Sequence, residues 1–265
     1  MARRRASKLR ARRSQANRAG SSPDAMPRIA LVDFLRGMTL LGMTVFHFVY
    51  DLEFFGLEEY GYSDQLHWWT LATIVAGSFL FLTGASLYLA HSEAVRWRPW
   101  GRRLVIIVLA ALSITIATRF VTPESYVFFG ILHMIAIASI AGLAFLRAPW
   151  WLAAAAAAAI LLIDEFIAVE WLNAFALSWL GLGSVDPVTS DFRPVFPWLA
   201  PAVLGVGAAK MCHLAGWLKV LAAPRLEGRW GTAVRFIGRH SLVYYLLHQP
   251  VLFALFWTWL QLAGQ

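Results

Sequence analysis

The stretch from Asp33 to Asp51, DFLRGMTLLGMTVFHFVYD, decides the fold, because it is apolar enough to enter a membrane and still carries charge. A charged side chain at membrane depth is costly, so it faces the interior of a helical bundle and not lipid. The polar residues of this stretch share one helical face with a leucine, at intervals of three or four residues: Asp33, Arg36, Leu40, Thr44, His47 and Asp51. The stretch therefore predicts a membrane-spanning helix with its polar face turned inward.

Composition extends this reading to the whole chain. Of 265 residues, 59% are hydrophobic and only 14% are charged, whereas a soluble domain has roughly 25% charged residues. Apolar runs of about 18 residues or more recur, and each can span a bilayer. We expect an all-α, polytopic helical bundle. Cys212 is the only cysteine, which excludes an intramolecular disulfide and a thiolate metal site. The histidines match no zinc motif, so no metal is expected.

The apolar runs predict about seven transmembrane helices after a basic tail at residues 1–28, which we expect to be disordered and cytoplasmic. Residues 29–265 form the predicted membrane domain. The segment 171–194 is expected to be a long loop, and 213–228 a short loop with an amphipathic turn. The predicted spans are 29–50, 68–90, 103–120, 125–146, 150–170, 195–212 and 235–262.

The charge distribution predicts the orientation. With the N-terminus in the cytoplasm, 20 of the 23 Lys and Arg fall on the cytoplasmic side and 11 of the 15 Asp and Glu fall on the outer side. Cytoplasmic loops of membrane proteins are enriched in Lys and Arg. The formal net charge of +8 is therefore a topology signal and a contact with anionic membrane lipid, and no nucleic-acid partner is expected.

Several polar residues at membrane depth are candidates for chemistry. Asp33 and Arg36 are spaced as an ion pair near the cytoplasmic end. Asp51 lies one turn after His47, where a carboxylate can hold the imidazole tautomer that a general base needs. His67 and His133 are predicted in the outer half of their spans, while Ser241, Tyr244 and His248 fall at helical spacing in the last span. Each of them could instead be a packing residue that only hydrogen-bonds neighbouring helices.

Six pieces in order carry a family resemblance: VDFLRG, FHFVYDLEFFG, GSFLFLTGASL, FFGILHMIAIASI, FRPVFPW and GRHSLVYYLLHQPV. With these six pieces, the chain resembles the transmembrane acyltransferases. It is most similar to the bacterial DUF1624 group, which is related to the catalytic domain of heparan-α-glucosaminide N-acetyltransferase. The resemblance covers about residues 28–255.

The resemblance implies a multi-pass enzyme of the bacterial inner (plasma) membrane. It would move an acetyl or other short acyl group from cytoplasmic acyl-CoA to a sugar or glycan outside. It implies a donor site that includes Asp33, Arg36 and Arg239, with Ser241, Tyr244 and His248 nearby. Asp191 lies at the outer mouth and could orient the acceptor.

The catalytic histidine has three candidates, His47, His67 and His133, and the resemblance bears on the first two. Arg36 and His47, with ten residues between them, match a spacing found in the wider acyltransferase family 3. The heparan subfamily has its histidine after the first span, where His67 is the nearest position. His47 is placed first, with Asp51 stabilising its imidazolium. It could act as general base or as nucleophile.

Two other classes of function are compatible with the residues alone. A transporter or permease could use the buried His, Asp and Arg as a relay, although the chain shows none of the inverted repeats that favour one. A non-catalytic membrane scaffold could use the same groups only to specify helix packing.

Overall fold

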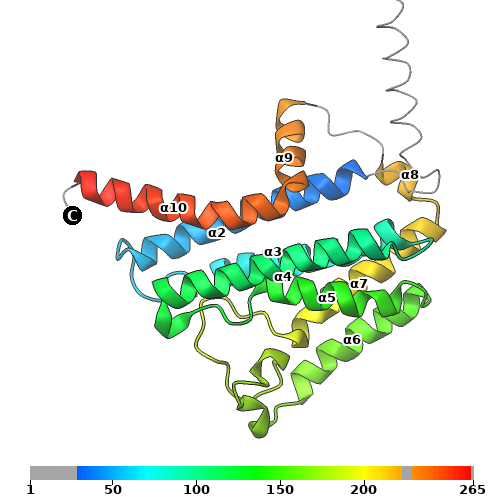
Figure 1. Cartoon of the computed structure of the whole chain (residues 1–265), viewed down its shortest axis with the longest axis horizontal. Helices are drawn as coiled ribbons and strands as arrows, with labels where there is room; N and C mark the ends of the chain where they lie inside the picture. Colours follow the sequence, from blue (N-terminus) through cyan, green and yellow to red (C-terminus); the bar gives the residue numbers. More distant parts are fainter. Residues whose placement is uncertain (1–28, 223–227, 264–265) are drawn as a thin grey trace, which may run out of the picture.

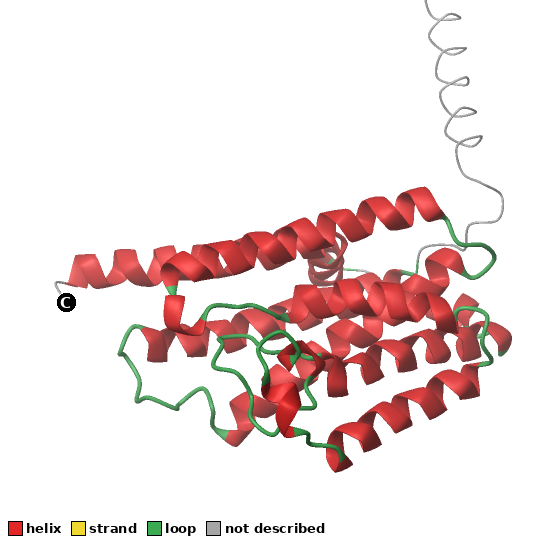
Figure 2. Cartoon of the chain, turned by 60° about the horizontal axis from the view of Figure 1, so that its bottom comes forward, coloured by secondary structure: helices red, strands yellow, loops and turns green. Residues whose placement is uncertain are grey.

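The computed structural model describes residues 29–222 and 228–263, and in them every regular element is a helix (Figure 2). The predicted tail at residues 1–28 lies outside the described residues. The helices are α2 Ala30–Phe54, α3 Leu66–His91, α4 Trp97–Val121, α5 Ile131–Phe145, α6 Trp150–Phe166, α7 Val195–Leu214, α8 Leu218–Leu221, α9 Arg229–Arg239 and α10 Ser241–Ala263, with short 3-10 turns η1 Pro123–Ser125, η2 Glu170–Asn173 and η3 Ser178–Leu180.

Five described helices are long and apolar enough to cross a membrane: α2, α3, α4, α7 and α10. The predicted all-helical membrane class is therefore confirmed. Helices α5 and α6 have only 15 and 17 residues, short of the roughly 20 that a span usually needs, so the number seven stays a prediction. Residues 171–194 form the expected connection between α6 and α7, built around η2 and η3.

Three predicted boundaries were wrong. The third span was expected to begin at 103, but α4 begins at Trp97. The last span was expected over 235–262, but the helix breaks at His240 and becomes α9 and α10, because the chain turns where α9 crosses α2. The fourth span was expected to begin at 125, but α5 begins at Ile131. The backbone before it is extended, and the Asp191 carboxylate accepts the Ile131 N–H at 2.9 Å, so that a distant side chain fixes the start of this helix.

The centre of the bundle is the crossing of α3 and α7, the most extensive contact between two described helices. Two glycines allow this close approach. A Cβ on Gly84 would lie 1.8 Å from the Ala202 carbonyl oxygen, and a Cβ on Gly205 would lie 2.0 Å from the Phe81 carbonyl oxygen. Small residues at such crossings let two backbones pack closely in a membrane.

Helices α2, α9 and α10 form a second layer beside this bundle (Figure 1). Helix α2 packs against α3, α9 and α10. Its polar face is turned inward, with Asp33 and Asp51 buried, whereas Met38, Val45 and Phe48 are exposed on the other side. Contacts of Thr44 with Tyr244 and of Asp51 with Gln249 show that α2 and α10 run parallel.

The parallel arrangement constrains the topology. If the five long helices cross the membrane, α2 and α10 can point the same way only when an even number of chain reversals lies between them. Helices α5 and α6 must then either both cross or both fail to cross. The parallel direction of α2 and α10 requires an odd number of spans, so it is compatible with five or seven membrane spans and excludes six.

Gly84→Ala is expected to lower the apparent melting temperature of the detergent-purified protein, because the added methyl group pushes α3 away from the α7 backbone at a cost of about 1–3 kcal/mol. Gly77→Ala on the same helix is the matched control, since a Cβ there meets no atom within 4 Å. Alanine is a better helix former than glycine, so the control should melt unchanged or higher. Equal melting temperatures for the two variants would contradict the assigned crossing.

The predicted orientation can be tested by labelling with a membrane-impermeant maleimide on a Cys212→Ser background. Tyr60, which is 99% exposed between α2 and α3, should react as Tyr60→Cys in intact spheroplasts. Exposed Arg96, between α3 and α4, should react as Arg96→Cys only after the membrane is permeabilised. The opposite pattern would reverse the orientation that the charge distribution predicts.

Candidate functional site

Four polar side chains meet where α2 and α10 pack together. His47 and Asp51 come from α2, and His248 and Gln249 come from α10. The rings of His47 and His248 lie with their centroids 4.9 Å apart. Gln249 Nε2 donates a hydrogen bond to Asp51 Oδ1 at 2.6 Å, and Asp51 is fully buried. The first and last long helices thus each supply one histidine and one partner of a buried hydrogen bond.

This cluster keeps hydrogen-bonding capacity that the described residues leave unused. Four of its buried atoms have no hydrogen-bond partner in the part of the chain that the structure describes: His47 Nδ1, Asp51 Oδ2, His248 Nε2 and Gln249 Oε1. An unsatisfied buried polar atom costs about 1–3 kcal/mol, and native structures contain few of them. Four around one histidine pair mark a place built to receive a polar group.

The surroundings of His248 determine which of its nitrogens can accept a proton. His248 Nδ1 lies 2.6 Å from the Tyr245 carbonyl oxygen, which can only accept, so Nδ1 carries the proton. In the neutral ring Nε2 then holds the free lone pair. Tyr244 stacks parallel to the ring, and its hydroxyl lies 2.8 Å from Thr44 Oγ1 on α2. His248 is therefore held in the tautomer and orientation that suit a general base.

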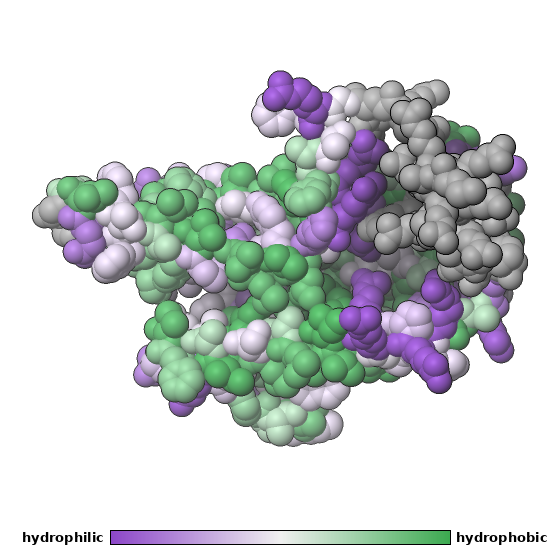
Figure 3. All heavy atoms as spheres, turned by 45° about the horizontal axis from the view of Figure 1, so that its top comes forward, coloured by the Kyte–Doolittle hydropathy of each residue, from purple (hydrophilic) through white to green (hydrophobic). Residues whose placement is uncertain are grey.

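The histidine pair opens into a cavity of about 1890 Å³ that runs along the bundle between the α2–α10 layer and α3, α4, α5 and α7. One end is strongly basic, and the other end carries acidic and hydroxyl side chains. Figure 3 shows hydrophilic side chains gathered near α9 and apolar side chains over the middle of the molecule. The basic end is lined by Arg36, Arg98, Arg102 and Arg103, and the opposite end by Ser63, Asp64, Asp164, Asp186, Ser190, Asp191 and one arginine, Arg193.

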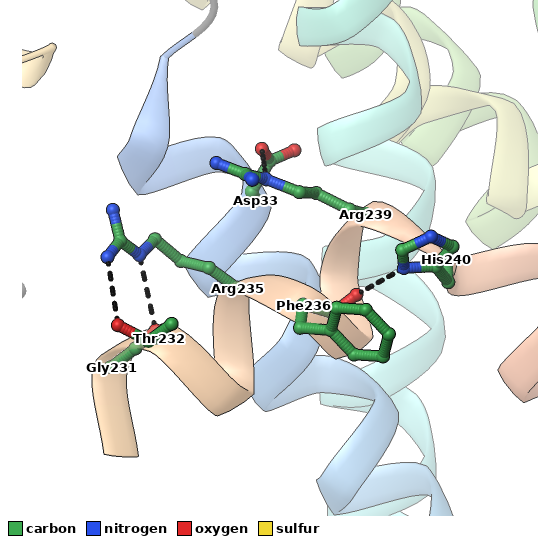
Figure 4. Close-up of polar contacts among 7 residues, drawn as sticks. All are labelled: Asp33, Gly231, Thr232, Arg235, Phe236, Arg239 and His240. Atoms are coloured by element: carbon green, nitrogen blue, oxygen red, sulfur yellow. Dashed lines mark hydrogen bonds and ion pairs between the residues drawn. The ribbon is translucent and has the colours of Figure 1, made fainter. Parts of the chain in front are cut away.

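At the basic end the structure separates the predicted donor residues into two groups. Arg36 donates to the Ser86 hydroxyl on α3 and lines the cavity together with Ser241. Asp33 is buried and forms an ion pair with Arg239, Nε to Oδ2 at 3.2 Å (Figure 4). Among the described residues, neither Asp33 nor Arg239 lines the cavity. Their pair joins α9 to α2, so Arg36 and Ser241 are the members of the set that can reach a ligand there.

The other two predicted catalytic histidines lie away from the pair. His133 Nδ1 accepts the Gly130 N–H at 3.2 Å, its Nε2 lies 3.4 Å from Thr115 Oγ1, and the ring stacks on Phe129. His67 is exposed in the first turn of α3. Neither is among the described residues that line the cavity. The geometry thus gives His133 a packing environment and leaves His67 at the surface.

Asp191 lies at the acidic end, as its sequence position predicts. Its carboxylate caps α5 through the Ile131 N–H, and its other oxygen lies 3.6 Å from Arg193 Nε. Arg193 in turn stacks over the Trp198 ring at 4.8 Å. These contacts hold Asp191 in place at the cavity wall, where it can still accept a hydrogen bond from a ligand.

Sequence reasoning missed Gln249 and assigned Asp51 the wrong partner. The sequence predicts that Asp51 hydrogen-bonds His47, but the structure pairs Asp51 with Gln249 and leaves His47 Nδ1 without a partner among the described residues. The pairing of α10 with α2 decides this, and helical spacing within α2 alone does not reveal it. In the described parts of the chain, no cluster of three or more His, Cys, Asp or Glu side chains forms a metal site.

Gln249→Met is expected to destabilise the protein by about 1–3 kcal/mol, because it removes the one hydrogen-bond donor that the described residues give to the fully buried Asp51 carboxylate. Chemical unfolding in detergent, followed by circular dichroism, measures this. Gln65→Met is the matched control, since Gln65 is exposed in the turn before α3. The assigned contact is wrong if the two variants unfold at the same denaturant concentration.

One of three comparisons with known proteins gave a match. A family model described as "Heparan-alpha-glucosaminide N-acetyltransferase, catalytic" matches residues 28–250. Neither the comparison with curated proteins nor the comparison with solved structures gave a match. The matched range covers most of the chain, including both histidines of the pair and all five long helices except the last part of α10. The chain therefore belongs to the family of heparan-alpha-glucosaminide N-acetyltransferase catalytic domains, and its family and long apolar helices together indicate a membrane acetyltransferase.

Proposed function

We propose that the protein transfers an acetyl or other short acyl group from cytoplasmic acyl-CoA to a sugar or glycan on the outer side of a bacterial inner membrane. One observation carries the proposal. A single cavity joins a basic end to an acidic end, and a pair of histidines lies between them. A donor and an acceptor could then approach the same histidines from opposite ends.

The basic end suits the phosphates of coenzyme A. Arginine binds phosphate through several donors in a fixed geometry, and four arginines line this part of the cavity. Arg36 and His47 are eleven positions apart on α2, which corresponds to roughly 16 Å along the helix axis. A phosphopantetheine arm is long enough to cover this distance, so the thioester of a bound acyl-CoA would reach the histidine pair.

The chemical step needs a base for the acceptor. In the direct route, His47 Nδ1 or His248 Nε2 takes the proton from the acceptor hydroxyl or amine as the acceptor attacks the thioester carbonyl. The carbon–sulfur bond then breaks, and the CoA thiolate leaves and is reprotonated from the imidazolium. In the covalent route, His47 attacks the thioester carbonyl, the carbon–sulfur bond breaks and the CoA thiolate leaves. The acceptor then takes the acyl group from His47 as it loses its proton to His248.

The acidic end suits a polar acceptor. Asp64, Asp186 and Asp191 at this end can accept hydrogen bonds from sugar hydroxyls or attract an amino sugar that is protonated before it reacts. The name of the matching family includes a glucosaminide, so glucosamine and glucose are suitable probes for the acceptor. Product from glucosamine alone would indicate an amine acceptor, and product from both would indicate hydroxyl chemistry.

The test uses purified full-length protein in detergent, with acetyl-CoA binding measured by calorimetry and acetyl-CoA hydrolysis measured by thiol release. Arg36→Gln should weaken binding by about 10–100-fold, the value of one charge-assisted hydrogen bond. His47→Gln and His248→Gln should lower turnover by about 100–10,000-fold with little change in binding. Exposed Arg147→Gln is the control for loss of one positive charge.

Each arm has an outcome that contradicts the proposal. If the wild-type protein does not bind acetyl-CoA, the donor assignment is wrong. If both histidine variants retain full turnover while His67→Gln loses it, the base lies outside the described cavity and the histidine pair is structural. An Arg147→Gln loss as large as the Arg36→Gln loss would mean that the arginines act only through net charge.

A further inference from the structure

Helix α9 packs against α2. It runs across α2 and α10, and its first turn extends away from the bundle (Figure 1). If α2 and α10 run along the membrane normal, α9 lies in the membrane plane. Trp230 is 86% exposed and Phe236 is 62% exposed on this helix. Trp230 neither packs in the core nor lines the cavity, so its ring must contact something outside the described bundle.

The donor site does not account for the basic residues of α9. Arg229, Arg235 and Arg239 all lie on this helix, yet no residue of α9 is among the described residues that line the cavity. Arg239 is paired with Asp33. Arg235 donates to the Gly231 carbonyl and lies 3.3 Å from Thr232 Oγ1 within its own helix (Figure 4), which leaves further guanidinium donors unused.

The positions of its residues divide α9 into three faces. Gly231, Val234 and Gly238 form the face toward α2. The apolar face next to it carries Trp230, Ala233 and Ile237. The remaining face carries Arg229, Thr232, Arg235, Phe236 and Arg239. An amphipathic helix with arginines on one face and tryptophan on another is typical of helices that lie in the membrane interface.

Close backbone contact fixes α9 at one level of α2. A Cβ on Gly238 would lie 1.8 Å from the Asp33 carbonyl oxygen, and a Cβ on Gly37 would lie 2.1 Å from the Val234 carbonyl oxygen. Asp33 lies one turn from the start of α2 at Ala30. Because α2 is a candidate membrane span, its first turns lie near the boundary between headgroups and hydrocarbon. The crossing therefore holds α9 at that boundary.

We propose that α9 is an interfacial helix that binds the anionic headgroups of membrane phospholipids through Arg229 and Arg235 while Trp230 enters the acyl region beside them. Charge complementarity identifies the partner. The basic face would meet lipid phosphates, and each arginine near an anionic membrane surface contributes about 1 kcal/mol of attraction. This binding surface is separate from the cavity and does not depend on the proposed acyl transfer.

The orientation of α9 is tested by spin-label accessibility in vesicles that contain phosphatidylglycerol. The label is attached in turn at Trp230→Cys and Thr232→Cys on a Cys212→Ser background of the full chain. Position 230 should be more accessible to oxygen, which concentrates in lipid, and position 232 to a water-soluble nickel complex. Equal accessibility profiles at the two positions would overturn the proposal, whether both are aqueous or both are buried in lipid.

Headgroup binding is tested by native mass spectrometry with phosphatidylglycerol and phosphatidylcholine as probes. The double variant Arg229→Gln/Arg235→Gln should lose about fivefold in phosphatidylglycerol retention for each arginine removed and should retain phosphatidylcholine as the wild type does. The matched control Arg96→Gln/Arg147→Gln removes two exposed arginines that lie elsewhere. Equal losses in both double variants, or equal retention of both lipids by the wild type, would overturn the proposal.

Discussion

The hydrogen bond between Gln249 and Asp51 is the interaction on which the candidate site depends. Helix α10 packs mainly on α2, with a smaller contact to α9, so few contacts fix its register. Slipping α10 along α2 would leave the buried Asp51 carboxylate without a donor. The observed register is therefore much more stable than its neighbours. This register brings the imidazole of His248 beside that of His47.

The two layers of the molecule are held by different kinds of contact. The crossing of α3 and α7 is made of glycines and small residues at backbone contact, which gives a rigid wall with little room for side-chain rearrangement. The layer of α2 and α10 is held by polar contacts and aromatic rings, among them Phe54, Phe55 and Phe253. The cavity lies between the two layers, so the rigid α3–α7 wall faces the α2–α10 wall that carries the histidine pair.

Much of this arrangement follows from sequence, and the part that does not has a common cause. Three-to-four spacing predicted that Asp33, His47 and Asp51 share an inward face of α2, and the structure agrees. Apolar length predicted the class of fold. Periodicity within one helix carries no information about its neighbours, so it predicted neither Gln249 as the partner of Asp51 nor the ion pair of Asp33 with Arg239. The break at His240 was missed for the same reason, since the crossing with α2 makes it. Gly84 illustrates the limit, because only the position of α7 distinguishes it from Gly77 on the same helix.

The parallel pairing of α2 and α10 has a consequence for how the protein is made. Helix α2 is the first described helix to leave the ribosome and α10 is the last. Until α10 is inserted, Asp51 has no Gln249 to bind and His47 has no second imidazole beside it. A nascent chain stalled before α10 can hold every other described helix and still lack half of the histidine pair. Assembly of the histidine pair is thus coupled to completion of synthesis, and partly inserted chains would expose the polar face of α2.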